Sequence, residues 1–230
     1  MAKKLTEGEK RCLEAYNAYK QENPKPRKNL IKLVKHMNML NPVANEKSWE
    51  YIFFDRQLND EQVDFLLKMK LRKPYYVKDL TKLTGKDLVE TAKFVDDICQ
   101  VGILEYCSAP DGEDMVQLPV FAPGAMETTV MTKERSDAFP EMAPAFLNYV
   151  LDLQKKISSF VPMGNALMRA IPVEKAIEHE TRKVKYEEIS YWLDKAGDSI
   201  AVAPCECRKL RVMVDEGTGD LEGDYCINLG

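Results

Sequence analysis

The stretch of sequence that decides the fold runs from residue 59 to residue 121 and reads NDEQVDFLLKMKLRKPYYVKDLTKLTGKDLVETAKFVDDICQVGILEYCSAPDGEDMVQLPVF. Asn59 and Asp60 are residue types that cap helices, so we expect a helix that begins at one of them and continues through Lys70. Apolar residues at helical spacing predict a second, short helix over residues 77–83 and a third over residues 87–101. Gly102 is expected to end the third helix, because glycine is favoured just past a helix C-terminus.

Two short strands are predicted after the third helix. They run from Ile103 to Cys107 and from Met115 to Phe121, with a polar loop between them. The third helix is expected to turn one apolar face toward the core, made of Leu88, Ala92, Val95 and either Ile98 or Cys99. Helix, helix, turn, helix and two-stranded wing is the element order of a winged helix-turn-helix, so we predict a winged-helix-like domain over residues 58–131.

The rest of the chain is divided around this domain. Residues 1–57 are predicted to form a helical amino-terminal arm, in which Pro24 and Pro26 separate two helical stretches. Residues 132–230 are predicted to form a helical linker and a cysteine-containing module. The expected fold class is therefore α+β and mainly helical, with a winged-helix-like domain followed by a small cysteine-containing module.

The charge distribution argues against nucleic acid as a partner. The formal net charge of the 230 residues is -4. The helix that would read DNA in a winged-helix protein carries four carboxylates, which are those of Asp87, Glu90, Asp96 and Asp97. Because carboxylates repel the phosphates of a duplex, we do not expect this helix to bind DNA.

The amino terminus indicates a cytoplasmic protein. It is charged and lacks the apolar segment of a signal peptide, and no later stretch approaches the roughly 18 apolar residues that a membrane span needs. We therefore expect no membrane partner. In a reducing compartment the six cysteines are expected to be thiols and not structural disulfides.

Three of the cysteines are grouped near the carboxyl end of the sequence. Cys205 and Cys207 are separated by a single residue and follow Pro204 after the apolar stretch 199–203. Cys226 lies in the next segment. Thiolates are soft ligands that bind iron–sulfur clusters and zinc. The sequence therefore predicts that Cys205, Cys207 and Cys226 are metal ligands, whereas Cys12, Cys99 and Cys107 stand singly among apolar neighbours.

The residues beside these cysteines fit a negatively charged centre. Arg208, Lys209 and Arg211 would lower the thiol pKa values and offset the charge of a thiolate-bound cluster, and we assign cofactor contact to Arg208. Two alternatives remain on spacing alone, since Cys-x-Cys is not a strong metal pattern: a zinc site, and three cysteines that lie together without a metal. Either metal takes four ligands, and the segment supplies three thiols.

The sequence resembles a known family at these residues. The run from Leu58 to Met131, the stretch Ile171–Ile177 and the segment from Ala201 through Cys207 to Cys226 are similar to the amino-terminal region of anaerobic iron–sulfur (4Fe-4S) FAD/NAD(P)-dependent oxidoreductases. The resemblance implies a 4Fe-4S cluster on the grouped cysteines. It also implies FAD and NAD(P) bound by polypeptide outside this chain, and a ferredoxin-type domain. Thr218 departs from the family pattern, in which a cysteine ligand usually holds that place.

Together these observations give two functional hypotheses. The first is the electron-transfer region of an iron–sulfur oxidoreductase, which would work with a ferredoxin-like or flavin-containing portion or subunit and is compatible with a homo-oligomer. The second is a winged-helix regulator or interaction module whose cysteines bind zinc or sense redox state. A winged helix that docks the rest of an enzyme is compatible with the first hypothesis.

Overall fold

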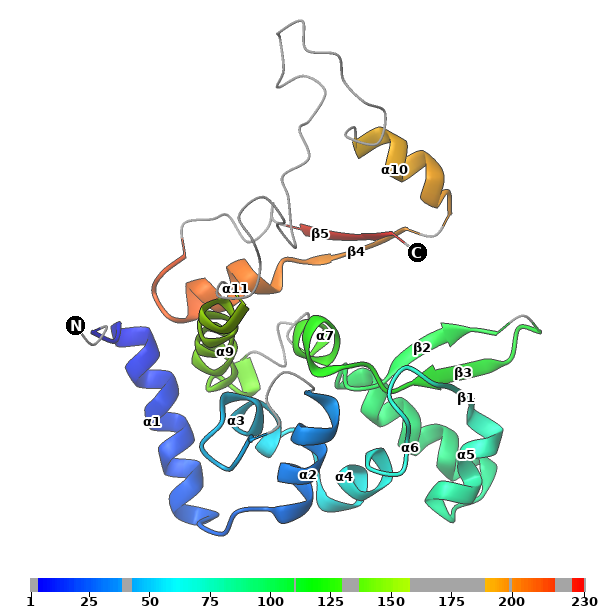
Figure 1. Ribbon diagram of the computed structural model, residues 1–230, viewed down its shortest axis with the longest axis horizontal. Helices are drawn as coiled ribbons and strands as arrows, with labels where there is room; N and C mark the ends of the chain where they lie inside the picture. The colour runs from blue at the N-terminus through cyan, green and yellow to red at the C-terminus, as the bar shows by residue number, and fades with distance from the viewer. Residues whose placement is uncertain are drawn as a thin grey trace, which may run out of the picture.

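A computed structural model describes residues 4–38, 43–109, 111–129, 137–157, 189–198, 200–217 and 225–229. Over these residues the chain is α+β and mainly helical, as predicted (Figure 1). The helices are α1 (Glu7–Glu22), α2 (Lys28–Met37), α3 (Trp49–Asp55), α4 (Asp60–Leu66), α5 (Val77–Thr84), α6 (Leu88–Gln100), α7 (Met126–Thr128), α9 (Met142–Ile157), α10 (Ile189–Ala196) and α11 (Glu206–Met213). The strands are β1 (Pro74–Tyr76), β2 (Glu105–Ser108), β3 (Asp114–Gln117), β4 (Ile200–Pro204) and β5 (Tyr225–Leu229). None of the described helices is long and apolar enough to cross a membrane.

Side-chain caps fix where the helices of the 59–121 stretch begin. Asn59 caps α4 by accepting a hydrogen bond from the Gln62 amide, and the Gln62 side chain accepts one from the Asn59 amide. Asp87 caps α6 in the same way through the Glu90 amide. The predicted starts are therefore confirmed. Helix α4 nevertheless ends at Leu66 and not at Lys70, because the chain turns there and buries Met69.

The first sheet has three antiparallel strands in the order β1-β3-β2. Val116 on the central strand lies opposite both Tyr75 and Tyr106. Both predicted strands are present with shifted ends, and β3 stops at Gln117 shortly before Pro119, which has no amide hydrogen to donate. Strand β1 was not predicted, since three residues are too few for an alternating pattern to be recognised.

The inward face of α6 differs in part from the prediction. Val95 and Ile98 are buried as expected, but Leu88 is 53% exposed and Ala92 is also exposed. Thr91 faces the interior, where its hydroxyl lies 2.8 Å from that of Thr84 at the end of α5. The buried face of α6 is therefore formed by Thr91, Val95 and Ile98, and Leu88 and Ala92 lie outside it.

One continuous hydrophobic core runs through the described residues. At its centre Phe121 packs edge-on against Phe53, Phe54 and Tyr149, with ring centroids 5.7, 5.3 and 4.9 Å away. These aromatic rings come from α3, the segment after β3, and α9. The core therefore draws on all three predicted segments, 1–57, 58–131 and 132–230, and the division of the chain into domains stays a prediction.

Helix α11 is held in place by α1 and α9. Leu210 and Val214 at its carboxyl end are fully buried in the core. The Thr6 hydroxyl donates to the Val214 carbonyl oxygen at 2.5 Å, and a Cβ on Gly8 would lie 2.5 Å from the Val214 backbone. Only glycine fits this close approach. Figure 1 shows the β4–β5 ribbon and α10 beyond α11, on the side of the molecule away from α2 and α4.

Candidate metal centre

The β4–β5 ribbon brings two of the grouped cysteines to the same end of the ribbon. The strands are antiparallel, and Cys226 lies directly opposite Ala203. Cys205 follows two residues after Ala203 with an extended backbone (φ -73°, ψ 105°). Continuing the alternation of β4 one residue past Pro204 would put Cys205 on the face shared by Ala203 and Cys226, where diagonal neighbours typically have Cβ atoms up to about 7–8 Å apart.

The third thiol comes from the helix that follows the ribbon. Cys205 is the N-cap residue of α11, and Cys207 lies in its exposed first turn. Amide groups at a helix N-terminus favour negative charge, so this turn suits a thiolate. Arg208 is the next residue and is exposed. Because Leu210 anchors the helix in the core, the ribbon end and the first turn of α11 are held at one place in the fold.

The glycine at the end of this segment lies against α11. A Cβ on Gly217 would come within 2.9 Å of the Val212 backbone, so the chain returns across the helix at a distance that only glycine permits. Thr218, which departs from the family pattern, lies outside the described residues.

The side chains themselves do not form a ligand group in this structure. Within the described ranges, no three His, Cys, Asp or Glu side chains approach closely enough to hold a metal ion. The three residues nevertheless carry thiols, the ligand type that soft metals prefer. They come from one end of the ribbon and from the helix turn beside it. A four-ligand centre would also need a fourth ligand beside Cys205, Cys207 and Cys226.

The other three cysteines lie in different surroundings. Burial raises the pKa of the Cys12, Cys99 and Cys107 thiols, and that of Cys99 reaches about 12. These thiols stay protonated near neutral pH, which makes them poor ligands and poor nucleophiles. Cys12 is buried and Cys99 packs against the core, whereas Cys107 is half-buried in β2.

Comparison with known proteins adds no relative to this picture. No family model, curated protein or solved structure matches this chain. The resemblance to iron–sulfur oxidoreductases therefore stays a prediction, and the site is judged on its own residues.

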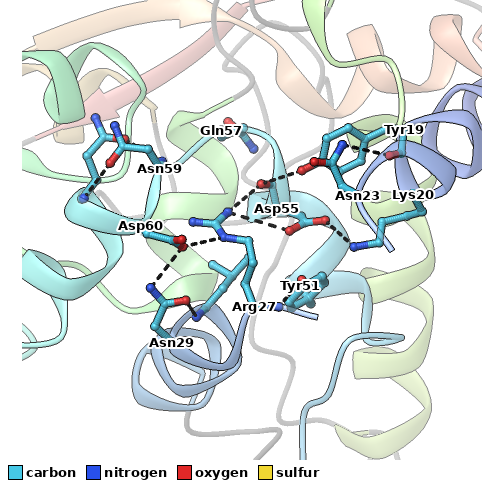
Figure 2. Close-up of polar contacts among 12 residues, drawn as sticks. Tyr19, Lys20, Asn23, Arg27, Asn29, Tyr51, Asp55, Gln57, Asn59 and Asp60 are labelled. Atoms are coloured by element: carbon cyan, nitrogen blue, oxygen red, sulfur yellow. Dashed lines mark hydrogen bonds and ion pairs between the residues drawn. The ribbon is translucent and has the colours of Figure 1, made fainter. Parts of the chain in front are cut away.

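Sequence reasoning missed a second polar cluster, which joins α1, α3, α4 and the start of α2 (Figure 2). The Asp55 side chain is fully buried and accepts a hydrogen bond from Lys20 Nζ at 3.1 Å. Arg27 donates from Nη1 to the Asp55 carbonyl oxygen and from Nε to Asp60 Oδ1, both at 2.8 Å. The Arg27 backbone amide donates to the Tyr51 hydroxyl at 3.1 Å.

This cluster borders a cavity of about 350 Å³ that also touches Tyr19 and Asn23. Arg27 Nη2 and Asp55 Oδ1 are buried there without a hydrogen-bond partner. The cluster contains no nucleophile, and its two cations face two carboxylates, so we assign it to the packing of the helices. No local signal marks it in the sequence, because its residues come from four separate segments.

Proposed function

We propose that this chain is the electron-transfer region of an iron–sulfur oxidoreductase, with Cys205, Cys207 and Cys226 as ligands of a 4Fe-4S cluster. The observation that supports the proposal is the register of the β4–β5 ribbon, in which Cys226 lies opposite Ala203, two residues before Cys205 at the start of α11. A thiol on β5, one at the N-cap of α11 and one in the first turn of that helix are the soft donors that an iron–sulfur cluster uses.

The surroundings support a negatively charged centre. The N-terminal turn of α11 provides amide groups and a positive dipole end beside Cys207. In the proposal, Arg208 contacts the cofactor and offsets its charge, a lever by which proteins tune cluster potentials. A bound cluster would accept and release single electrons, while the chain's own residues would hold it and shield its sulfur atoms.

The remaining parts of the enzyme lie in other polypeptide under this proposal. A fourth ligand, FAD and NAD(P) would come from a ferredoxin-like or flavin-containing portion or subunit, working in the cytoplasm. Val202 and Ile227, a cross-strand pair on the ribbon face opposite Cys226, are 60% and 50% exposed. A two-stranded ribbon is marginally stable alone in water, so apolar surface of such a partner would stabilise it.

We also propose that residues 58–131 form a winged-helix-like domain. The support is the order α4, β1, α5, α6, β2, β3 together with the sheet order β1-β3-β2. The outward surface of α6 carries Leu88 and Val89, 53% and 79% exposed, and the carboxylate of Glu90. An apolar and acidic surface suits protein docking and repels DNA phosphates, which favours the enzyme over the regulator hypothesis.

Metal and sulfide analysis of protein purified without oxygen tests the cluster. We expect iron, acid-labile sulfide and broad visible absorbance, all lost in Cys207→Ser and retained in the matched control Cys107→Ser, whose thiol is in the sheet. Stoichiometric zinc in place of iron would favour the regulator hypothesis. Equal loss in both variants, or none in either, would reject the ligand assignment. Duplex DNA binding with a steep salt dependence would reject the docking role of α6.

A further inference from the structure

One face of α2 carries a row of three lysines. Lys28, Lys32 and Lys35 are spaced four and three residues apart, so they lie above one another on the helix. All three are exposed. Over seven residues at 1.5 Å per residue the row is about 10 Å long. We refer to these three residues as the lysine row.

The row stands on a rigid support. The opposite face of α2 consists of Leu30, Leu33, Val34 and Met37, each with 0% exposure. This burial fixes both the position and the rotation of the helix. The three charges are therefore presented in a constant arrangement, and a partner does not have to order the backbone when it binds.

The positive charges of the lysine row are not balanced by carboxylates of the described residues. No carboxylate of the described residues lies within ion-pair distance of the three lysines, whereas some other lysines are paired, such as Lys20 with Asp55 and Lys86 with Glu61. Helix α2 has no acidic residue in its first turn, where Lys28 faces the unfavourable end of the helix dipole. Like charges at this spacing repel one another. The chain thus holds a self-repelling positive strip on a protein of net charge -4.

The positive strip continues beyond the carboxyl end of α2. His36 Nε2 lies 2.9 Å from the Met69 carbonyl oxygen, which brings the connection after α4 beside the helix. Lys70, Arg72 and Lys73 in that connection are exposed. On its flank the strip is bordered by carboxylates, because Asn29 donates to both Asp60 and Asp64 at 3.1 Å. These carboxylates limit the width of the positive surface on the side that faces α4.

We infer that the lysine row is a docking surface for an acidic protein segment, a helix that presents carboxylates at the same spacing. A single helix fits a strip one helix wide. A DNA duplex is about twice as wide, and its second strand would lie over the bordering carboxylates. No large exposed apolar side chain lies on α2 to enter a lipid surface. This inference does not depend on the metal centre, which lies on the other side of the molecule (Figure 1).

The test uses two helical peptides of identical composition. One carries glutamates at positions i, i+4 and i+7, and the other has the same glutamates spread around the helix. Each is titrated into the isotopically labelled chain at low salt, and amide shifts in the NMR spectrum give the affinity and the contacted residues. We expect the matched peptide to bind about tenfold more tightly than the other peptide, because it can form three exposed ion pairs with the lysine row at once. The amide shifts should be centred on α2.

Charge-reversal variants assign the effect. Lys28→Glu, Lys32→Glu and Lys35→Glu together should abolish the preference for the matched peptide. A matched control that reverses the exposed Lys4, Lys47 and Lys82 should keep it. Equal binding of the two peptides, or a preference that survives reversal of the row, would overturn the inference. Tighter binding of duplex DNA or anionic vesicles through the same three lysines would overturn it in favour of that partner.

Discussion

Replacing Asp55 by Asn tests how the buried polar cluster holds the helices together. The Asp55 side chain has 0% exposure and balances Lys20 and Arg27, which are 22% and 19% exposed. Removing one partner of a buried ion pair costs about 3–5 kcal/mol, because a charge is left uncompensated. Both cations keep some contact with water and Arg27 keeps Asp60, so we expect the lower end, about 3 kcal/mol.

Urea unfolding followed by circular dichroism measures this loss. With a slope of about 2 kcal/mol per molar urea, a loss of about 3 kcal/mol moves the midpoint down by about 1.5 M. Asp60→Asn is the matched control, since its side chain is 69% exposed and it pairs with the same arginine. Exposed pairs contribute below about 1 kcal/mol. Equal shifts for the two variants would refute the assignment of Asp55 as the buried centre of the cluster.

Three further predictions concern the backbone, pH and thiol reactivity. Gly85 and Gly102 both have positive φ, but a Cβ meets nothing at Gly85 and comes 2.7 Å from the Thr128 backbone at Gly102. Gly85→Ala should therefore cost about 1–2 kcal/mol and Gly102→Ala clearly more; equal losses in thermal unfolding would contradict this. Burial raises the pKa of Glu141 above 4.5, so its contribution to stability is full below that pH and is lost as pH rises through the folded-state pKa. Wild type should thus gain stability relative to Glu141→Gln on acidification, and parallel pH profiles would contradict it. Cys99, with a pKa of about 12, should resist alkylation at pH 8 in the native chain and react on unfolding, as mass spectrometry can check.

Much of the local structure could be predicted from the sequence because its signals are short-range. Asn59 caps α4, as expected of Asn59 or Asp60, Asp87 caps α6 where the third helix was predicted to begin, and Gly85 ends α5 with a left-handed backbone. The rotation of α6 could not be predicted in this way. Thr91 lies on the buried face beside Thr84, and a pattern of apolar residues does not register a polar residue there.

The candidate metal centre was only partly predictable. The grouping of Cys205, Cys207 and Cys226 is visible in the sequence, but their relation in space depends on the register of β5 against β4. A shift of one residue would turn Cys226 to the other face of the ribbon. The cluster around Asp55 was beyond sequence reasoning, because tertiary folding alone brings Lys20, Arg27 and Asp55 together.

The docking surface proposed on α2 rests on which face of that helix is buried. The basic residues of this stretch are visible in the sequence, where a solvated face and a partner surface are equally compatible. Burial of the opposite face and the absence of a carboxylate partner among the described residues distinguish Lys28, Lys32 and Lys35 from paired lysines such as Lys86. Net charge gives no indication of such a strip, since it averages over the whole surface.

Electron paramagnetic resonance of the chain, purified without oxygen and reduced with dithionite, tests the proposed cluster most directly. We expect the signal of a reduced 4Fe-4S cluster, lost or altered in Cys226→Ser and unchanged in Cys107→Ser. A signal that is identical in wild type and Cys226→Ser would contradict the ligand assignment, and stoichiometric zinc without any iron signal would contradict the electron-transfer function.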